Sequence, residues 1–346
     1  MGVEVANADF TFGNPIPVPN VSSDYGDTYV HISKDSLSLY ITSLRPGGYG
    51  DRDLWVAKRS TKNDEWGTPV NLGPKVNSSG WDACASISTD NLVLYFYSLN
   101  RSGGYGGLDL WVSTRETIDD DWGEAVNLGP TFNTAGHNWA PNISADNLSL
   151  YFTCDRPGGS GHFDMWVSTR ETVQDEWGTP VNLGSTINWS NWDSKPTISA
   201  DGLAIFFTRI ITYREGKDED FNVWFTRRAT IHDDWDTPIP VPFNTSYVEG
   251  STSISADGST LYFVSNRPAT PSCDIWQVSI EPVINLNGDG IVDAADMCIV
   301  VDNWGTDNQL CDVGPMPWGD GIVDVEDLIV IAEHLFEEFP PVESAE

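Results

Sequence analysis

Apolar positions recur at a constant spacing along most of the chain. Short runs in which apolar and polar residues alternate end at five isoleucines spaced 55 or 56 residues apart, at Ile32, Ile87, Ile143, Ile198 and Ile254. Alternation with a period of two is typical of half-buried β-strands, and each isoleucine precedes an Asp-Gly, Asp-Asn or Asp-Ser turn. The pattern predicts five copies of one β-sheet unit.

Each unit contains signals for four strands. The second strand is the alternating run after the turn, the third begins with an acid, an apolar residue and Trp, and the fourth follows another Trp. In the fourth unit, Asn222 stands in place of the acid. Four short strands per repeat are typical of a propeller blade. The sequence therefore predicts an all-β five-bladed β-propeller over residues 11–282, preceded by a tail at 1–10.

The fifth unit stops after its third strand, near Ile280. The missing strand signal stands at the other end of the chain, where residues 12–19 have the same pattern as residues 235–242 of blade four. Unpaired edge strands are prone to aggregation, so closed architectures avoid them. We expect the N-terminal strand to complete the last blade.

Three motifs carry a family resemblance. Residues 45–48 read Arg-Pro-Gly-Gly, residues 53–55 read Asp-Leu-Trp, and residues 255–258 read Ser-Ala-Asp-Gly. Over about residues 12–280 the chain resembles the TolB-type and WD-repeat-like propeller repeats. The resemblance implies the propeller architecture and leaves function open, because such folds serve binding, scaffolding and catalysis alike.

A different pattern follows the propeller. Two acidic loops each precede an apolar helical segment, and glycine stands at position six of the first loop. Oxygen ligands at this spacing are those that calcium prefers. The predicted ligands of the first loop are Asn285, Asn287, Asp289, the carbonyl of Ile291, Asp293 and Asp296. Those of the second are Asp312, Asp320, the carbonyl of Ile322, Asp324 and Asp327.

The second loop departs from the first near its start. Asp289 lies 4 residues after Asn285, whereas Asp320 lies 8 residues after Asp312. Its first ligands stay open: Asp312 could reach the metal around the insertion, or a backbone carbonyl could replace it.

The duplicated loop and helix resemble the type I dockerin, in which Asp closes the loop at position 12. This resemblance implies a small α-helical module over residues 283–339, with a tail at 340–346. It also implies calcium as cofactor and a cohesin-like or scaffold protein as partner. The alternative is that the module packs against the propeller of the same chain or of a neighbouring copy.

The overall charge restricts the classes of molecule that the protein could bind. The chain has 51 acidic and 18 basic residues, giving a net charge of −33. This balance argues against binding nucleic acid or an anionic membrane surface, and it suits calcium and an extracellular or cell-surface location. No stretch approaches the roughly 20 apolar residues of a membrane span, so we expect no membrane insertion. Cys298 and Cys311 flank one turn of the module and could form a disulfide.

Candidate chemistry gathers before the first strand of each blade. An oxygen-bearing side chain stands five residues before each aligned isoleucine, at Asp27, Asp82, Asn138, Asp193 and Glu249. In a propeller these positions share a face with the loops between the second and third strands. The other predicted ligand-binding residues on that face, besides Asn138, are Trp81, Trp139, Trp192, Lys195, Tyr49 and Tyr105. Polar groups bind sugar hydroxyls and indoles stack on sugar rings, which favours a polysaccharide ligand.

Three interpretations of the recurring acids remain open. They cap backbone amides or hold a channel ion as part of the repeat, they bind a ligand, or they catalyse hydrolysis. Five-bladed propellers include arabinanase-type glycoside hydrolases, which would make Asp27, Asp82, Asp193 and Glu249 the catalytic candidates, with Asp193 and Glu249 the best pair.

Departures from the repeat are more specific than the repeat itself. Lys195 stands where the other blades have Tyr29, Cys84, Ala140 and Ser251. The recurring arginines Arg45, Arg101, Arg156 and Arg267 are expected to pair with Asp53, Asp109, Asp164 and Asp274 and fix loops. The sequence favours an extracellular, non-catalytic, glycan-binding or assembly protein. A propeller glycoside hydrolase and a self-assembling structural subunit are the alternatives.

Overall fold

The computed structural model describes residues 10–190, 192–210, 221–268, 272–282, 284–287, 291–306, 308, 311–314 and 322–337. The predicted calcium ligands Asp289 and Asp320, the tails at 1–9 and 340–346, and the blade-four segment 211–220 lie outside these residues. The chain divides into two compact units, with the division inside the last propeller strand.

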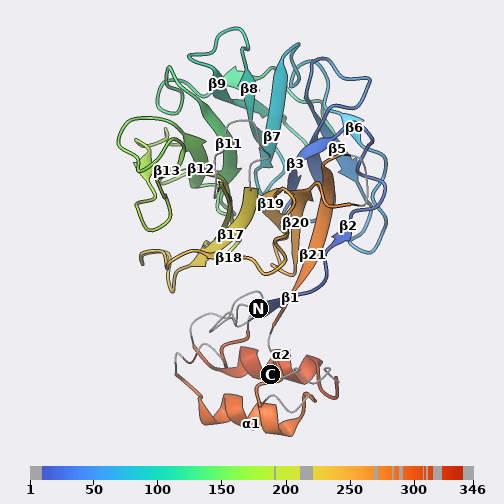
Figure 1. Cartoon of the computed structure of the whole chain (residues 1–346), viewed down its shortest axis with the longest axis vertical. Helices are drawn as coiled ribbons and strands as arrows, with labels where there is room; N and C mark the ends of the chain where they lie inside the picture. Colours follow the sequence, from blue (N-terminus) through green and yellow to red (C-terminus); the bar gives the residue numbers. More distant parts are fainter. Residues whose placement is uncertain are drawn as a thin grey trace. The chain divides into compact units, whose positions relative to one another are not determined.

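The predicted five-bladed β-propeller is confirmed, with antiparallel blades, of which the first four have four strands each (Figure 1). Blade one contains β3(Asp27–Ile32), β4(Ser38–Ser43), β5(Asp53–Lys58) and β6(Val70–Asn71). Blade two contains β7(Trp81–Ile87), β8(Val93–Leu99), β9(Leu108–Thr114) and β10(Val126–Asn127). Blade three contains β11(Asn138–Ile143), β12(Ser149–Cys154), β13(Asp164–Thr169) and β14(Val181–Asn182). Blade four contains β15(Trp192–Ile198), β16(Ala204–Ile210), β17(Phe221–Arg227) and β18(Ile239–Pro240).

Blade five is assembled from both ends of the propeller sequence. It contains β19(Glu249–Ile254), β20(Thr260–Ser265) and β21(Asp274–Pro282), together with β1(Phe10–Phe12) and β2(Ile16–Pro17). Ile16 and Pro17 pair with Gln277 and Trp276, in the place that β6 takes beside β5 in blade one. The N-terminal segment therefore supplies the outer strand that the fifth repeat lacks.

Polar side chains connect the innermost strands, which lie around the centre of the propeller in Figure 1. The residue before each aligned isoleucine is buried and polar, and it bonds the backbone of the next blade. The amide of Ile87 donates to His31 Nε2 at 3.2 Å, and that of Ile143 donates to Ser86 Oγ at 3.0 Å. The remaining contacts are Ile198 N to Asn142 Oδ1 (3.0 Å), Thr197 Oγ1 to Thr252 O (2.6 Å) and Ile32 N to Ser253 Oγ (3.0 Å). These five contacts close the ring.

The hydrophobic core lies between neighbouring blades. Phe96 of blade two and Leu54 of blade one are fully buried in one cluster, and Phe152 of blade three packs with Leu110 of blade two in the next. A twisted sheet packs its apolar face on the sheet beside it, so every blade depends on its neighbours. The core fixes the positions of the loops at each end.

The C-terminal unit contains two helices among its described residues, α1(Ala294–Asp302) and α2(Val325–Glu333). Each begins with a capping box, formed by Asp293 with Asp296 and by Asp324 with Asp327. Val292 and Val323 lie in the small core of this unit. The repeated loop and helix match the predicted duplication, whereas a dockerin fold stays a prediction. Neither helix of the described chain has the length and apolar composition needed to cross a bilayer.

The disulfide considered between Cys298 and Cys311 is absent. Both thiols are free. Cys298 is exposed on α1, whereas Cys311 is buried in the core of the unit. Their side chains therefore occupy different environments.

His31 makes ring closure sensitive to pH. Burial lowers the pKa of His31 from 6.5 to about 3, helped by the charge of Lys34. The unfolded chain binds this proton at higher pH than the folded chain, so stability present above pH 6.5 is lost as the pH falls towards 3. Relative to His31→Asn, which copies Asn142 of blade three, the native chain should lose about 1.4 kcal/mol of unfolding free energy per pH unit in this window. Denaturant unfolding of both chains at several pH values measures the difference, and parallel pH curves would contradict the assignment.

Candidate functional site

The loops that precede the innermost strands share one end of the propeller with the loops between the second and third strands. In blade one, Asp27 pairs with Ser43, and Ser43 pairs with Asp53, so the first residues of β3 and β5 lie at the same end. The same register recurs in blades two, three and four. We call this end the mouth face.

The recurring acids at the start of the innermost strands are buried. Asp27, Asp82, Asn138, Asp193 and Glu249 are each 0% exposed. Every carboxylate binds an arginine: Asp27 with Arg45 at 2.8 Å, Asp82 with Arg101 at 3.2 Å, Asp193 with Arg209 at 2.6 Å and Glu249 with Arg267 at 3.0 Å. Each also accepts a backbone amide four residues earlier in its loop, from Ser23, Ser78, Trp189 and Thr245. These contacts fix the mouth loops, as the repeat-architecture interpretation predicted.

Blades three and four keep this arrangement with different residues. In blade four the arginine is Arg209, on the strand itself, where the other blades have a serine or Cys154. Its guanidinium still lies over the third-strand indole of Trp224, at 4.7 Å from the ring centroid. In blade three, Asn138 replaces the acid, and Arg156 binds the carbonyl of Phe132 at 2.5 Å. The guanidinium position is therefore common to all five blades.

The expected arginine partners are wrong. Arg45 binds Asp27 and not Asp53, because Asp53 accepts the loop amides of Tyr49 at 2.5 Å and Gly50 at 3.0 Å. The equivalent Asp109 and Asp164 also bind loop amides. Both acids fix the mouth loops, but through different groups.

The buried contacts of Asp82 and Asp193 determine whether these acids could act in catalysis. Burial raises the pKa of Asp82 and of Asp193, and the neighbouring arginine offsets only part of that rise. A raised pKa suits a proton donor, but these side chains have no exposed surface to meet a substrate. Hydrolysis by the usual route needs two carboxyl groups on either side of a glycosidic bond. The sequence placed these acids at the mouth surface, and the structure places them inside the loops.

One position of the innermost strand holds a different residue in each blade. Each innermost strand has a register shift, and the residue three before the aligned isoleucine, at or beside that shift, is Tyr29, Cys84, Ala140, Lys195 or Ser251. Four of them have positive φ, between 49° and 57°. Lys195 Nζ lies 5.0 Å from the ring centroid of Tyr29 and 5.5 Å from that of Phe221. Burial raises the pKa of Cys84 to about 12, so its thiol is neutral.

A row of aromatic rings connects four blades at the mouth. Tyr29 Oη and Tyr97 Oη are 3.1 Å apart. Edge-on ring contacts continue from Tyr97 to Trp139 (6.2 Å between centroids), from Trp139 to Phe163 (5.8 Å) and from Phe163 to Trp192 (4.8 Å). The row thus joins the predicted residues Trp139 and Trp192 through Phe163, which the sequence reasoning missed because it precedes the recurring Asp164 in a variable loop.

Trp81 lines a cavity, and the guanidinium group of Arg52 lies over its ring. The guanidinium carbon of Arg52 is 4.6 Å from its ring centroid. Trp81 also lines a mouth-face cavity of about 590 Å³ with Asp51, Ser78 and Asn100. Sequence reasoning missed Arg52, although it directly precedes the Asp-Leu-Trp motif. The cavity combines an indole with hydroxyl, amide and carboxylate groups.

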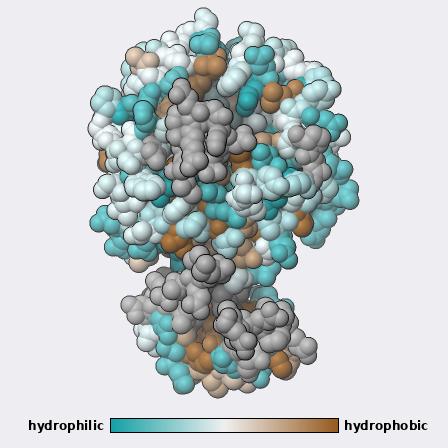
Figure 2. Space-filling view, viewed as in Figure 1, coloured by the Kyte–Doolittle hydropathy of each residue, from teal (hydrophilic) through white to brown (hydrophobic). Residues whose placement is uncertain are grey.

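Exposed aromatic side chains are confined to one end of the propeller. Among its described residues they are Tyr25 (59% exposed), Tyr49 (51%), Tyr105 (53%), Trp189 (50%) and Tyr247 (41%). All five stand in loops of the mouth face. The propeller surface drawn in Figure 2 is mainly hydrophilic where it is coloured, with separated hydrophobic residues.

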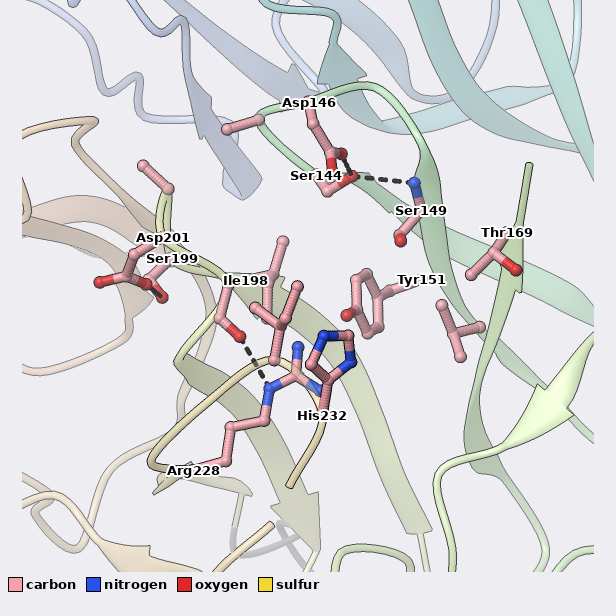
Figure 3. A pocket seen from close by; sticks show the side chains of 15 residues that line it. Ser144, Asp146, Ser149, Tyr151, Thr169, Ile198, Ser199, Asp201, Arg228 and His232 are labelled. Carbon is pink, nitrogen blue, oxygen red and sulfur yellow. Dashed lines mark hydrogen bonds between the residues drawn. The ribbon is translucent and has the colours of Figure 1, made fainter. Parts of the chain in front are cut away.

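The opposite end has a smaller cavity, between blades three and four (Figure 3). Its volume is about 330 Å³, and Tyr151, Arg228 and His232 are among its lining residues. The polar groups around it already make hydrogen bonds within the turns. Arg228 Nε donates to the carbonyl of Gly202 at 3.0 Å, and the guanidinium lies 4.4 Å from the Trp235 centroid. Since equivalent arginines cover Trp66, Trp122 and Trp177, this arrangement belongs to the repeat.

The two predicted calcium loops have matching contacts. Asp296, fully buried, accepts the amides of Asn287 at 3.1 Å and Asp293 at 2.9 Å. Asp327 accepts those of Gly314 at 2.8 Å and Asp324 at 2.6 Å. Gly314 therefore occupies the place of Asn287, so the second loop has no side-chain ligand at its third position. Asp312 correspondingly takes the place of Asn285.

The acidic donor set fits a hard cation, because its groups are carboxylate, amide and carbonyl oxygens. Among the described residues, no three His, Cys, Asp or Glu side chains come together as a metal cluster. The central carboxylates of both loops, Asp289 and Asp320, are not among those residues.

Comparison with known proteins supports the fold. No family model and no curated protein matches the sequence. The structure is similar to TolB from Acinetobacter baumannii, with 13% identity and a TM-score of 0.46, over 76% of this chain and 56% of that chain. It is also similar to the alpha-L-arabinofuranosidase from Lactobacillus brevis (14% identity, TM-score 0.51) and to a thermostable family-43 glycoside hydrolase (14%, 0.50), each over 77% of this chain and 92% of that chain. The last two similarities confirm the propeller fold.

Breaking one buried pair tests the structural role of the mouth acids. Asp82→Ala leaves Arg101 without its carboxylate and the Ser78 amide without its acceptor, which should cost about 3–5 kcal/mol of unfolding free energy. Denaturant unfolding of the full chain measures this cost. Asp51→Ala, at an exposed position on the same face, is the control. Equal unfolding free energies for the two variants would contradict the structural role.

Proposed function

We propose that the protein binds a polysaccharide at the mouth face without hydrolysing it. The observation that carries the proposal is the confinement of all exposed aromatic side chains of the described propeller to this face. Tyrosine and tryptophan offer a flat apolar surface and a polar edge, the combination that pyranose rings and hydroxyls require. The cavity beside Trp81 adds hydroxyl and amide groups from Ser78 and Asn100.

Hydrolysis is the second candidate function. Two observations favour it: the raised pKa of Asp193, and the fold shared with an arabinofuranosidase and a family-43 glycoside hydrolase. The buried ion pair of Asp193 with Arg209 weighs against it. Either activity places the same class of ligand on the mouth face.

Mouth-face variants should weaken binding. Trp81→Ala and Trp192→Ala each remove a stacking surface, and each should reduce affinity for a retained polysaccharide by about 1–3 kcal/mol. Ile118→Ala, exposed on the opposite face, is the control. The measurement is retention on a panel of insoluble polysaccharides, with reducing ends assayed in parallel. Sugar release that is lost in Asp193→Asn would replace binding with hydrolysis, and no retention on any polysaccharide would leave a self-assembling structural subunit.

We further propose that the C-terminal unit is a dockerin-like, calcium-binding module. Its support is the duplicated capping box and the matching contacts of Asp296 and Asp327. Bound calcium would neutralise the mutually repelling carboxylates of each loop. A cohesin-like or scaffold protein outside the cell would then be the partner, and a neighbouring copy of this chain is the alternative.

Calcium binding by the full chain tests this module. Asp296→Asn and Asp327→Asn should each lower the calcium stoichiometry by one site, because each removes the carboxylate that closes a loop. Isothermal titration calorimetry after chelation measures the stoichiometry. Asp302→Asn, exposed on α1, should leave it unchanged. If both loop variants bind as much calcium as the native chain, the loops are not calcium sites.

A further inference from the structure

We propose that the indole of Trp189 is the platform on which the mouth face stacks a neutral pyranose chain with equatorial hydroxyl groups, such as a β-1,4-linked glucan or xylan. This inference rests on the proposed glycan binding and adds the stacking residue and the class of sugar. It starts from two departures from the repeat that contact each other in blade four.

Trp189 stands at a position that the other blades fill with a small hydroxyl residue. The equivalent residues, four before the recurring mouth acid or Asn138, are Ser23, Ser78, Thr134 and Thr245. Each of their hydroxyls accepts the amide two residues later in its loop, at distances of 3.1–3.4 Å. An indole has no hydroxyl group and cannot make this contact. The tryptophan therefore does not serve the turn in the way that its counterparts do.

Arg209 is the second departure. It stands on β16, where the other blades have Ser43, Ser98, Cys154 and Ser265. Its guanidinium carbon lies 5.4 Å from the centroid of the Trp189 ring and 4.7 Å from that of Trp224. The guanidinium group is itself fixed, by Asp193 at 2.6 Å and by the carbonyl of Ile187 at 2.6 Å. A fixed cation over an aromatic ring stabilises the orientation of that ring.

The backbone that carries the indole is also fixed. The side chain of Asn188 bonds the amide and the carbonyl of Met165 in blade three, at 2.8 and 3.0 Å. The amide of Trp189 donates to Asp193 Oδ2 at 2.5 Å. A side chain that is already ordered loses little conformational freedom when a ligand binds. The indole is therefore pre-organised for stacking.

The indole is half exposed although a guanidinium group lies over its ring. Its exposed fraction is 50%. Of the tryptophans that the structure describes, only Trp189 and Trp304 are exposed to this extent, and Trp304 belongs to the C-terminal unit. Aromatic side chains contribute large contact areas to binding. One face of the Trp189 ring is thus held by Arg209, and the other face is open to a ligand.

The charge beside the ring restricts what the open face can bind. Arg209 already interacts with the negative face of the indole, and it would repel a second cation stacked on the other face. The net charge of −33 disfavours an anionic ligand. A neutral surface of C–H bonds carries neither penalty.

The geometry of the sugar ring selects among neutral glycans. In a pyranose with equatorial hydroxyl groups, the C–H bonds are axial and cover both faces of the ring. Such a ring presents the flat apolar surface that an indole contacts best. An axial hydroxyl group or a puckered furanose ring interrupts that surface. Glucose and xylose in β-1,4 linkage meet the requirement, whereas β-1,4-linked mannose and α-1,5-linked arabinofuranose do not.

The test is calorimetry of the full chain with cellohexaose, xylohexaose, mannohexaose and arabinohexaose. Cellohexaose or xylohexaose should bind at least about tenfold more tightly than the other two, because only their rings stack flat. Trp189→Ala and Trp189→Leu should weaken that binding about tenfold, whereas Trp189→Tyr, which keeps a flat ring, should stay within about threefold of the native chain. Trp304→Ala removes an equally exposed indole from the C-terminal unit and is the matched control. Thermal unfolding checks that all variants fold.

The outcomes separate the two proposals. Native affinity in Trp189→Ala, or equal affinity in Trp189→Leu and Trp189→Tyr, would overturn the stacking platform and leave glycan binding intact. Tighter binding of mannohexaose or arabinohexaose than of the other two would overturn the class of sugar. Binding of none of the four, together with no retention on any polysaccharide, would overturn the proposed function itself.

Discussion

The propeller depends on satisfying the backbone at its centre. The five blades are separate sheets, joined by backbone hydrogen bonds at the start of innermost strands, as from the amide of Asp82 to the carbonyl of Arg52 at 2.9 Å. Amides nearer the centre, such as that of Ile87, bond side chains instead. A buried amide without a partner costs about 1–3 kcal/mol, and the centre of the ring repeats that problem five times. Short polar side chains such as His31, Ser86 and Asn142 solve it by bonding the next blade. The ring therefore has a polar centre and apolar surfaces between its blades.

A second set of buried polar contacts fixes the loops of the mouth face. A carboxylate, an arginine and a loop amide meet at the start of most innermost strands, as at Asp27, Arg45 and Ser23. Such pairs contribute little net stability, because desolvation offsets the attraction, but losing one partner is costly. The repeat can thus vary its bulges and loop tips while its loops stay fixed. Lys195 and the exposed tyrosines stand at these variable positions.

The proposed function relies on residues that depart from the repeat. The acids that recur in most blades are buried and already bonded, whereas Arg52 and Lys195 each stand in one blade only and are partly exposed. Binding surfaces on repeat proteins arise in this way, since residues that hold one repeat to the next are not available to a ligand. The C-terminal unit also has a departure from its repeat, because the second loop has Gly314 where the first loop has Asn287.

The sequence by itself determined the number of blades, their turns, the strand that completes the last blade and the duplicated acidic loops. These features have a local cause: a period of two, a turn residue with positive φ or a fixed ligand spacing is written in neighbouring residues. The partners of the acids were decided only by the tertiary structure. Spacing paired Arg45 with Asp53, whereas in the fold Asp53 binds loop amides and Arg45 binds Asp27. Whether a side chain lines the mouth or lies beneath it depends on how strands and loops pack in three dimensions, and a one-dimensional repeat does not contain that information.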